Sequence, residues 1–349
     1  MAEITIANRR IGSGHPVFII AEISANHRGS LAVARETIEA AAAAGADAVK
    51  FQTYTADSLT LDSSQEYFRI QEGTVWDGRT LHDVYSEGEL PRAWHPELLS
   101  YAKELGLVAF SSPFDVEAVA FLDSLGVPAF KIASFEIFDF ELIAAAARTG
   151  KPVILSTGVA EESDIASAVE VCRSEGNSSV AVLKCTSAYP APPEELNLRN
   201  IPDMAERFNC VVGFSDHTMG LAAPLGAVAL GAQIIERHIT LDRDQAGLDS
   251  SFSTNPQEFA HLVQSVRELE VSLGSIDYSL GPSASRNRRF GRSLFIVRDV
   301  REGEIASSEN VRSIRPADGL HPRELTQVLG RRFSSSVSAG TPLQHEHLI

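Results

Sequence analysis

Residues 107–134 read LVAFSSPFDVEAVAFLDSLGVPAFKIAS and contain one full copy of the unit from which this fold is built. A short apolar run ends in serines, a segment of helical periodicity follows, a glycine closes that segment, and a second apolar run begins. The unit recurs and gives eight apolar runs: VFIIAE (17–22), ADAVKFQ (46–52), LVAFSS (107–112), PAFKIAS (128–134), PVILST (152–157), VAVLKC (180–185), VVGFSD (211–216) and AQIIERH (232–238). Eight buried strands that alternate with helices predict an α/β fold, the closed (β/α)8 TIM barrel.

The chain changes character after Gly281. Residues 282–291 are rich in serine, asparagine and arginine, which predicts a linker. Short β-type runs then replace the Ala-rich segments, and Val300-Arg-Glu-Gly303 is nearly repeated by Val337-Ser-Ala-Gly340. We therefore predict a barrel domain over residues 1–281 and a small β-rich domain over residues 292–349, too small to bury much core by itself.

Composition restricts the partners of this chain. Its 349 residues carry a formal net charge of -16, which opposes binding to nucleic acid or to an anionic membrane. The first apolar run is also too short to span a bilayer. Cys172, Cys185 and Cys210 lack the spacing of a disulfide framework or a zinc site, so we expect a cytoplasmic protein that binds small molecules.

Polar side chains follow the apolar runs, at the end of the barrel where TIM-barrel enzymes keep their active sites. In chain order they are Glu22, Lys50, Gln52, Ser111, Ser112, Lys131, Ser134, Glu136, Ser156, Thr157, Lys184, Ser215, Asp216, His217, Glu236 and His238. Three lysines that converge on one mouth would repel one another unless they face an anion, such as a phosphate or a carboxylate. The long connection from Thr53 to Leu107 should cover this mouth and contribute to function.

His217 and His238 follow adjacent strands, seven and eight, and Glu22 is next around a closed ring. Two histidines with a nearby carboxylate and open positions favour a divalent metal of the manganese or magnesium type, which acts as a Lewis acid. Asp216 is a candidate to orient a ring nitrogen of His217. The alternative is that one of the two histidines is packed in the core and bonded to backbone.

The motifs together resemble the sialic acid synthases over essentially the whole chain. They are AEISANH (21–27), KFQTYT (50–55), FSSPF (110–114), FKIASFE (130–136), LSTG (155–158), KCTSAYP (184–190), GFSDHT (213–218), IERH (235–238) and SIRPADGLHP (313–322). SANH (24–27), QTYTADSLTL (52–61) and GLHP (319–322) look most like the branch that makes pseudaminic acid. This resemblance implies condensation of phosphoenolpyruvate with 2,4-diacetamido-2,4,6-trideoxy-altrose, with C–O cleavage and release of phosphate.

The resemblance also implies roles for individual residues. Glu22, Lys131, His217 and His238 are implied to be catalytic, and the two histidines to hold Mn²⁺ or Mg²⁺. Phosphoenolpyruvate is implied to bind Lys50, Ser112, Lys131, Ser134, Ser156, Lys184, Ser187 and Ser215. The sugar is implied to bind Gln52, Glu136, Tyr189, Asp249 and Arg315.

Residues from about 292 resemble type III antifreeze proteins and the SAF domain. The resemblance implies that this domain closes the barrel of a partner subunit, with Arg315 reaching the sugar. It therefore implies a homodimer whose C-terminal domains are swapped.

Other functions stay open. Within the resemblance, an N-acetylneuraminate or legionaminic acid synthase would use the corresponding manno sugar. A Schiff-base aldolase would use Lys131 or Lys184 to attack a keto acid, although an imine mechanism needs no metal. A non-catalytic binding module on an inert barrel would have no use for lysines, histidines and Glu22 at one mouth.

Overall fold

The structure is a computed structural model that describes residues 2–71, 73–74, 76–245 and 247–349. The chain divides into two compact units, the first ending at Gly274 and the second running from Ser275 to Ile349. Residues 271–292, which include the boundary of the two units, are exposed, and they contain α11 (Pro282–Asn287) and η7 (Arg288–Phe290). The domain boundaries at 281 and 292 remain predictions.

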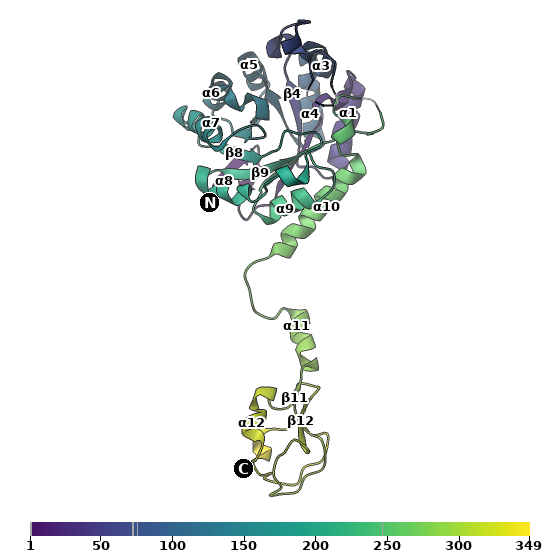
Figure 1. The fold of residues 1–349 in the computed structure, drawn as a ribbon, viewed down its shortest axis with the longest axis vertical. Coiled ribbons are helices and arrows are strands. Elements are labelled where there is room, and N and C mark those ends of the chain that lie inside the picture. The colour runs from purple at the N-terminus through teal and green to yellow at the C-terminus, as the bar shows by residue number, and fades with distance from the viewer. Residues whose placement is uncertain (1, 72, 75, 246) are drawn as a thin grey trace. The chain divides into compact units, whose positions relative to one another are not determined.

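The predicted TIM barrel is confirmed (Figure 1). Its parallel strands are β3 (Phe18–Glu22), β4 (Ala48–Thr53), β5 (Val108–Pro113), β6 (Phe130–Ile132), β7 (Val153–Ser156), β8 (Val180–Lys184), β9 (Val211–Asp216) and β10 (Ile234–His238). They close in chain order because β10 pairs with β3, His238 opposite Glu22. The carboxyl ends of all eight strands therefore meet at one mouth.

Helices surround the strands, as Figure 1 shows. They are α1 (Leu31–Ala43), α4 (His95–Glu104), α5 (Val116–Ser124), α6 (Phe140–Arg148), α7 (Glu162–Ser174), α8 (Asn200–Phe208), α9 (Ala222–Ala229) and α10 (Pro256–Leu273). Several begin at a side chain that accepts from a free backbone N–H, such as Asp115 from Ala118 and Asp139 from Leu142. No helix among the described residues is both long enough and apolar enough to cross a membrane.

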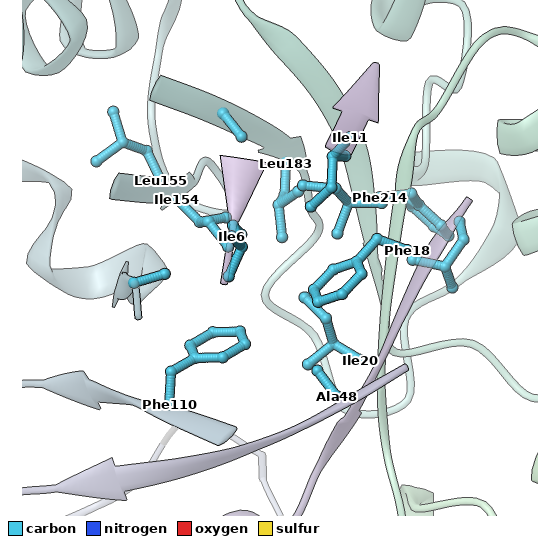
Figure 2. Close-up of a cluster of buried hydrophobic side chains, with 14 of the residues drawn as sticks. Ile6, Ile11, Phe18, Ile20, Ala48, Phe110, Ile154, Leu155, Leu183 and Phe214 are labelled. Carbon is cyan, nitrogen blue, oxygen red and sulfur yellow. The ribbon is translucent and has the colours of Figure 1, made fainter. Parts of the chain in front are cut away.

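An N-terminal hairpin, which the sequence analysis did not predict, contributes to the barrel core. Its strands are β1 (Glu3–Ile6) and β2 (Arg9–Gly12). Ile6 and Ile11 are buried among barrel side chains such as Phe18 and Phe110 (Figure 2). Arg9 pairs with Asp47, which directly precedes β4, so the hairpin lies at the amino ends of the strands. The barrel is thus filled from that end, and the opposite mouth is the one available for a ligand.

The long connection between β4 and β5 is folded rather than irregular, and we call residues 54–94 of it the insertion. It contains α2 (Ala56–Leu59), η2 (Glu66–Phe68), α3 (Leu81–Gly88) and η3 (Arg92–Trp94). A bridge between Arg69 and Thr80 forms a small hairpin in its middle. Two buried histidines fix the insertion and its ends: His27 Nε2 lies 3.2 Å from the Gly88 carbonyl within it, and His95 Nε2, directly after it, lies 2.7 Å from Oγ1 of Thr53, directly before it.

The second unit has a small core of its own. It contains β11 (Ser293–Ile296), β12 (Val311–Ile314), η8 (Pro322–Glu324), α12 (Leu325–Val328) and η9 (His345–His347). The two repeated segments of the sequence pair with each other, because Val300 and Val337 exchange backbone hydrogen bonds of 2.9 and 3.0 Å. Gly303 and Gly340 each adopt a positive φ at equivalent turns, which explains the glycine in both repeats.

Candidate active site

A cavity of about 390 Å³ opens at the carboxyl end of the barrel. Most of the charged and hydroxyl-bearing side chains of its lining come from seven of the eight barrel strands or from the residues that follow them, whereas Thr74 and Tyr85 come from the insertion. Predicted site residues that line it are Glu22, Lys50, Gln52, Lys131, Ser134, Glu136, Ser156, Ser187, Tyr189, Ser215, His217, His238 and Asp249. The barrel thus brings most of the predicted site into one space.

The floor of the cavity carries alternating charges. Lys50 Nζ lies 2.5 Å from Glu22 and 3.7 Å from Glu236, and Lys131 Nζ lies 3.6 Å from the same Glu236 oxygen. Burial raises the pKa of the Glu22 carboxyl to about 7, against the opposing charge of Lys50. Burial also acts to raise the pKa of Glu236, but Lys131 and Lys50 outweigh it and hold that pKa below its ordinary value. The lysines are therefore balanced by protein carboxylates within the floor.

A cradle of small groups lies beside these charges. Gly158 is close to two serines: a Cβ there would lie 2.0 Å from Ser187 Oγ and 2.8 Å from Ser134 Oγ. Ser134 Oγ accepts the Gly158 N–H at 3.1 Å. Ser156 Oγ is buried and has no hydrogen-bond partner among the described residues. The serine hydroxyls surround a backbone position that has room only for glycine, and Lys50 and Lys131 line the same cavity. Together these groups form a suitable site for an oxyanion.

The histidine pair lies in the same cavity, with ring centroids 5.4 Å apart. His217 Nδ1 lies 3.0 Å from the Thr186 carbonyl; donation of its N–H there leaves Nε2 with a free lone pair. His238 Nδ1 is buried and has no hydrogen-bond partner within the described part of the chain. In the described ranges, no group of three or more His, Cys, Asp and Glu is arranged to hold a metal ion. The two ring nitrogens are the candidate ligands that remain, and a metal held by them alone would take its other ligands from water and substrate.

Aromatic and apolar side chains form the outer part of the cavity. Tyr189 lies against His217 with ring centroids 4.4 Å apart, and Phe252 lies 4.9 Å from Tyr189. The insertion contributes Trp76, whose indole N–H donates to the Leu248 carbonyl at 3.1 Å. The cavity therefore changes from charged at its floor to apolar at its mouth.

Polar groups remain between these two zones. Gln52 Nε2 donates to Glu22 at 3.0 Å, and Asp249 accepts hydrogen bonds from the Ser24 hydroxyl and the Ala25 backbone. Glu136 Oε2 is buried and has no hydrogen-bond partner in the described chain, and burial raises the pKa of this carboxyl to about 7. These carboxylates are acceptors available to hydroxyl or amide groups of a ligand.

Three predicted site residues lie elsewhere. Ser112 is behind the floor, where its Oγ accepts from Lys50 Nζ at 3.1 Å. Lys184 does not line the cavity, and its Nζ donates to the Cys185 carbonyl at 2.6 Å. Its neighbour Cys185 contacts His217, so residue 185 faces the interior and residue 184 faces the other way. Arg315 is exposed on the second unit.

Asp216 also differs from its expected role. Its carboxylate accepts from the Thr218 backbone and hydroxyl at 2.9 and 2.7 Å, and it pairs with Arg237 at 3.2 Å. The Thr186 carbonyl rather than Asp216 lies beside the His217 ring nitrogen. Side chains of neighbouring strand residues point to opposite faces, so Asp216 and His217 cannot both face the cavity.

Comparison with known proteins agrees with this geometry. Residues 37–278 match the NeuB family, and residues 291–349 match the SAF domain. The chain belongs to the NeuB family. The resemblance to sialic acid synthases that the motifs indicated is thereby confirmed.

Individual NeuB-family relatives cover nearly the whole chain. It is 45% identical over 328 residues to the pseudaminic acid synthase of Campylobacter jejuni subsp. jejuni serotype O:23/36 (94% of this chain, 95% of that protein). It is 41% identical over 334 residues to the pseudaminic acid synthase of Helicobacter pylori (95% and 98%). The crystal structure of N-acetylneuraminic acid (sialic acid) synthetase from Leptospira borgpetersenii serovar Hardjo-bovis matches with a TM-score of 0.73 and 34% identity (82% and 94%).

The structure adds three residues to the predicted site of this NeuB-family chain. Glu236 stood among the strand-end residues without a role, yet it lies between both floor lysines. Gly158 ends the LSTG motif, and its lack of a side chain is what the cradle requires. Trp76 gave no motif signal beyond its place in a long connection, because its partner Leu248 is distant in sequence.

Proposed function

We propose that this chain is a pseudaminic acid synthase that condenses phosphoenolpyruvate with 2,4-diacetamido-2,4,6-trideoxy-altrose. The observation that carries the proposal is one cavity in which an oxyanion site and a histidine pair lie under an apolar mouth. The three relatives at 41–45% identity are pseudaminic acid synthases, whereas the structurally similar sialic acid synthetase is 34% identical. These identities support the altro sugar over N-acetylmannosamine or a legionaminic acid precursor.

The reaction forms one C–C bond between the reactants and one C–O bond from C2 to water, and it breaks the C–O bond to phosphate. C3 of the enol attacks the aldehyde carbon of the open-chain sugar, and the aldehyde oxygen becomes a hydroxyl after taking a proton. Water adds to C2 of the former enol, and phosphate leaves with its bridging oxygen. Glu22 is the proposed proton-transfer group, because it lies on the floor where both reactants meet.

Phosphoenolpyruvate is proposed to occupy the floor and the cradle. Lys50 and Lys131 supply positive charge, Ser134 and Ser187 supply hydroxyls around Gly158, and Ser156 supplies a further hydroxyl in the same cavity. Ser215 lies beside Glu236, 3.5 Å from its carboxylate, and extends the same surface. Ser112 contributes indirectly by holding Lys50. Lys184 would need to reorient before it could contact this ligand.

Gly158→Ala should impair phosphoenolpyruvate use, because the added Cβ would displace Ser187 Oγ and Ser134 Oγ. Two charge-assisted contacts of ~1.5–3 kcal/mol each would be weakened, so kcat/KM for phosphoenolpyruvate should fall by ~10²-fold or more. Phosphate release at varied phosphoenolpyruvate measures this. Val159→Ala, at the exposed next residue, is the matched control. A folded Gly158→Ala enzyme with unchanged kcat/KM would show that the cradle does not bind the phosphate.

The sugar is proposed to lie between the floor and the mouth. Glu136 and Asp249 can accept from its amide and hydroxyl groups, and Gln52 is held near the reacting end by Glu22. Burial raises the pKa of Tyr189, so its hydroxyl stays protonated and can donate. The Tyr189 ring offers an apolar face to the sugar at the same time.

A phosphate-release panel tests the substrate assignment. The altro sugar, its manno isomer and N-acetylmannosamine are each mixed with enzyme, phosphoenolpyruvate and Mn²⁺ or Mg²⁺. We expect the highest kcat/KM with the altro sugar, because an unmatched polar group in the pocket costs ~1–3 kcal/mol. Faster turnover of N-acetylmannosamine would reject the proposed sugar and leave the family assignment intact.

His217 and His238 are proposed to hold Mn²⁺ or Mg²⁺, which would polarise the aldehyde carbonyl when bound. A Schiff-base mechanism is the second candidate, because burial lowers the pKa of the Lys131 amine and would favour its nucleophilic form. Lys131 lies 3.6 Å from Glu236, however, and an ion pair there opposes imine formation. Borohydride should therefore trap no adduct of the enzyme with pyruvate.

The active form is proposed to be a homodimer in which the second unit of one subunit covers the barrel of the other. Phe135, Phe138 and Phe140 at the barrel mouth are 61%, 51% and 45% exposed, which is a large apolar rim for an uncovered surface. The segment 271–292 is exposed and gives the second unit room to reach a partner. We also propose a cytoplasmic location, consistent with three free cysteines.

A further inference from the structure

The cavity has two chemically different ends, and its mouth is built largely by the insertion. Five apolar side chains of the insertion line it: Leu59, Ile70, Trp76, Leu81 and Val84. We call these five residues the insertion wall. Leu248 and Phe252 also line the cavity. The charged groups on the floor come from the barrel strands instead.

Trp76 is the best fixed member of the insertion wall. Its indole N–H donates to the Leu248 carbonyl at 3.1 Å, and its ring lies 6.0 Å from Tyr189 and 6.4 Å from Phe252, measured between centroids. These contacts connect two segments that are 172 residues apart in sequence. The Trp76 side chain is therefore fixed by these contacts rather than free on a loop.

A single aromatic ring separates Trp76 from the reacting end of the cavity. Tyr189 contacts Trp76 on one side, and its ring centroid lies 4.4 Å from that of His217 on the other. A sugar in its open-chain form has the reactive aldehyde at C1 and its terminal carbon, C6, at the opposite end. If C1 meets the histidine pair and the floor, C6 extends toward the insertion wall.

We propose that the insertion wall selects sugars whose C6 is a methyl group, and that Trp76 is the main residue that determines this specificity. The inference rests on the proposed function, since it requires the aldehyde to react at the floor. A hydroxyl on C6 would be desolvated against apolar side chains. Thr74 also lines the mouth, but its hydroxyl already donates to Asp77 at 3.0 Å. Tyr54 and Tyr85 of the insertion also line the cavity. The five side chains of the insertion wall, however, offer one polar group, the Trp76 N–H, which already donates to Leu248. A C6 hydroxyl placed against the wall therefore loses water without a matching contact there.

The test compares two acceptors that differ only at C6: 2,4-diacetamido-2,4,6-trideoxy-altrose and 2,4-diacetamido-2,4-dideoxy-altrose. Wild type should prefer the 6-deoxy sugar in kcat/KM by ~10- to 100-fold, the range for an apolar pocket that rejects an added hydroxyl. Trp76→Ala should reduce this ratio at least several-fold, mainly through KM for the sugar, with KM for phosphoenolpyruvate unchanged. Val84→Thr, which adds a hydroxyl at nearly constant volume, should also lower the ratio.

Tyr67→Ala is the matched control, because Tyr67 is an aromatic residue of the same insertion that is 91% exposed and does not line the cavity. The ratio of kcat/KM for the 6-deoxy sugar to kcat/KM for the 6-hydroxy sugar should be the same in Tyr67→Ala as in wild type. If wild type uses the 6-deoxy altro sugar but the ratio is unchanged in both Trp76→Ala and Val84→Thr, the insertion wall does not select C6. If wild type uses neither altro sugar, the proposed function fails, and the inference fails with it. Should Trp76→Ala be inactive, the ratio for Val84→Thr decides.

Discussion

Alanine at His217 or at His238 should lower kcat/KM by ~10³-fold or more while the barrel stays folded. Loss of a Lewis acid removes several kcal/mol of transition-state stabilisation, and each 1.36 kcal/mol is a factor of ten in rate. Both histidines line the cavity at the carboxyl end of the barrel, outside its packed interior layers. Wild type after exhaustive chelation should be equally inactive and should recover when Mn²⁺ or Mg²⁺ is added.

Three measurements separate a metal role from a structural one. Circular dichroism and thermal unfolding of the variants report the fold, and metal content after gel filtration reports binding without reference to turnover. His15→Ala is the matched control, since His15 contacts Glu3 at 3.1 Å in the N-terminal hairpin, at the opposite end of the barrel. Full wild-type turnover after metal is shown to be absent would reject the metal, and the two histidines would then need another role.

The barrel was predictable because its strands are short, apolar on both faces and separated by helices with clear ends. Each of the eight predicted runs overlaps one barrel strand, and the bounds differ by at most two residues at either end. The N-terminal hairpin was not found, since β1 and β2 are only four residues long, and the alternation of exposed and buried residues in β1 is too short to be recognised as a strand signal. Their burial depends on contact with a barrel that a local pattern does not describe.

The site was predictable to the extent that strand ends identify it. A sequence shows that Lys50, Lys131 and Lys184 all lie near the ends of strands, but not which face each one occupies. Lys184 is directed away from the interior because Cys185 contacts His217, and a shift of one residue reverses a side chain's direction. The three lysines also suggested a bound anion as their partner. In the structure Lys50 lies beside Glu22 and Lys131 lies beside Glu236, so these two lysines already have protein carboxylates as partners.

Contacts between segments that are distant in the chain could not be predicted from the sequence. Trp76 and Leu248 meet only because the insertion folds back over the mouth. Gly158 reads as an ordinary turn residue until Ser134 and Ser187 are seen to surround it. In both cases the information lies in tertiary contacts between loops, which carry no periodic signal.

The second unit should act in trans, and Arg315 provides the means to test this. Arg315 is exposed and belongs to the second compact unit rather than to the barrel. Residues 271–292, where the chain passes from one unit to the other, are also exposed. A guanidinium suits a lid because its planar fork bonds several sugar oxygens and stays charged at any working pH. Arg315→Ala alone should therefore impair sugar use strongly and leave phosphoenolpyruvate binding intact.

Mixing two inactive variants, Arg315→Ala and Glu22→Gln, should restore activity if the lid acts in trans. In a swapped heterodimer, one barrel has both its own Glu22 and the partner's intact Arg315, while the other has neither. Equal mixing of exchanging two-fold dimers then gives about a quarter of the wild-type sites. If each lid instead covers its own barrel, every site lacks one of the two groups and the mixture stays inactive.

Tagged subunits should be used to show that exchange has occurred, and a mixture of Arg315→Ala with itself provides the baseline. Exchange without recovered phosphate release would exclude the trans arrangement, whereas recovery near a quarter of wild type would establish that each active site is shared by two subunits.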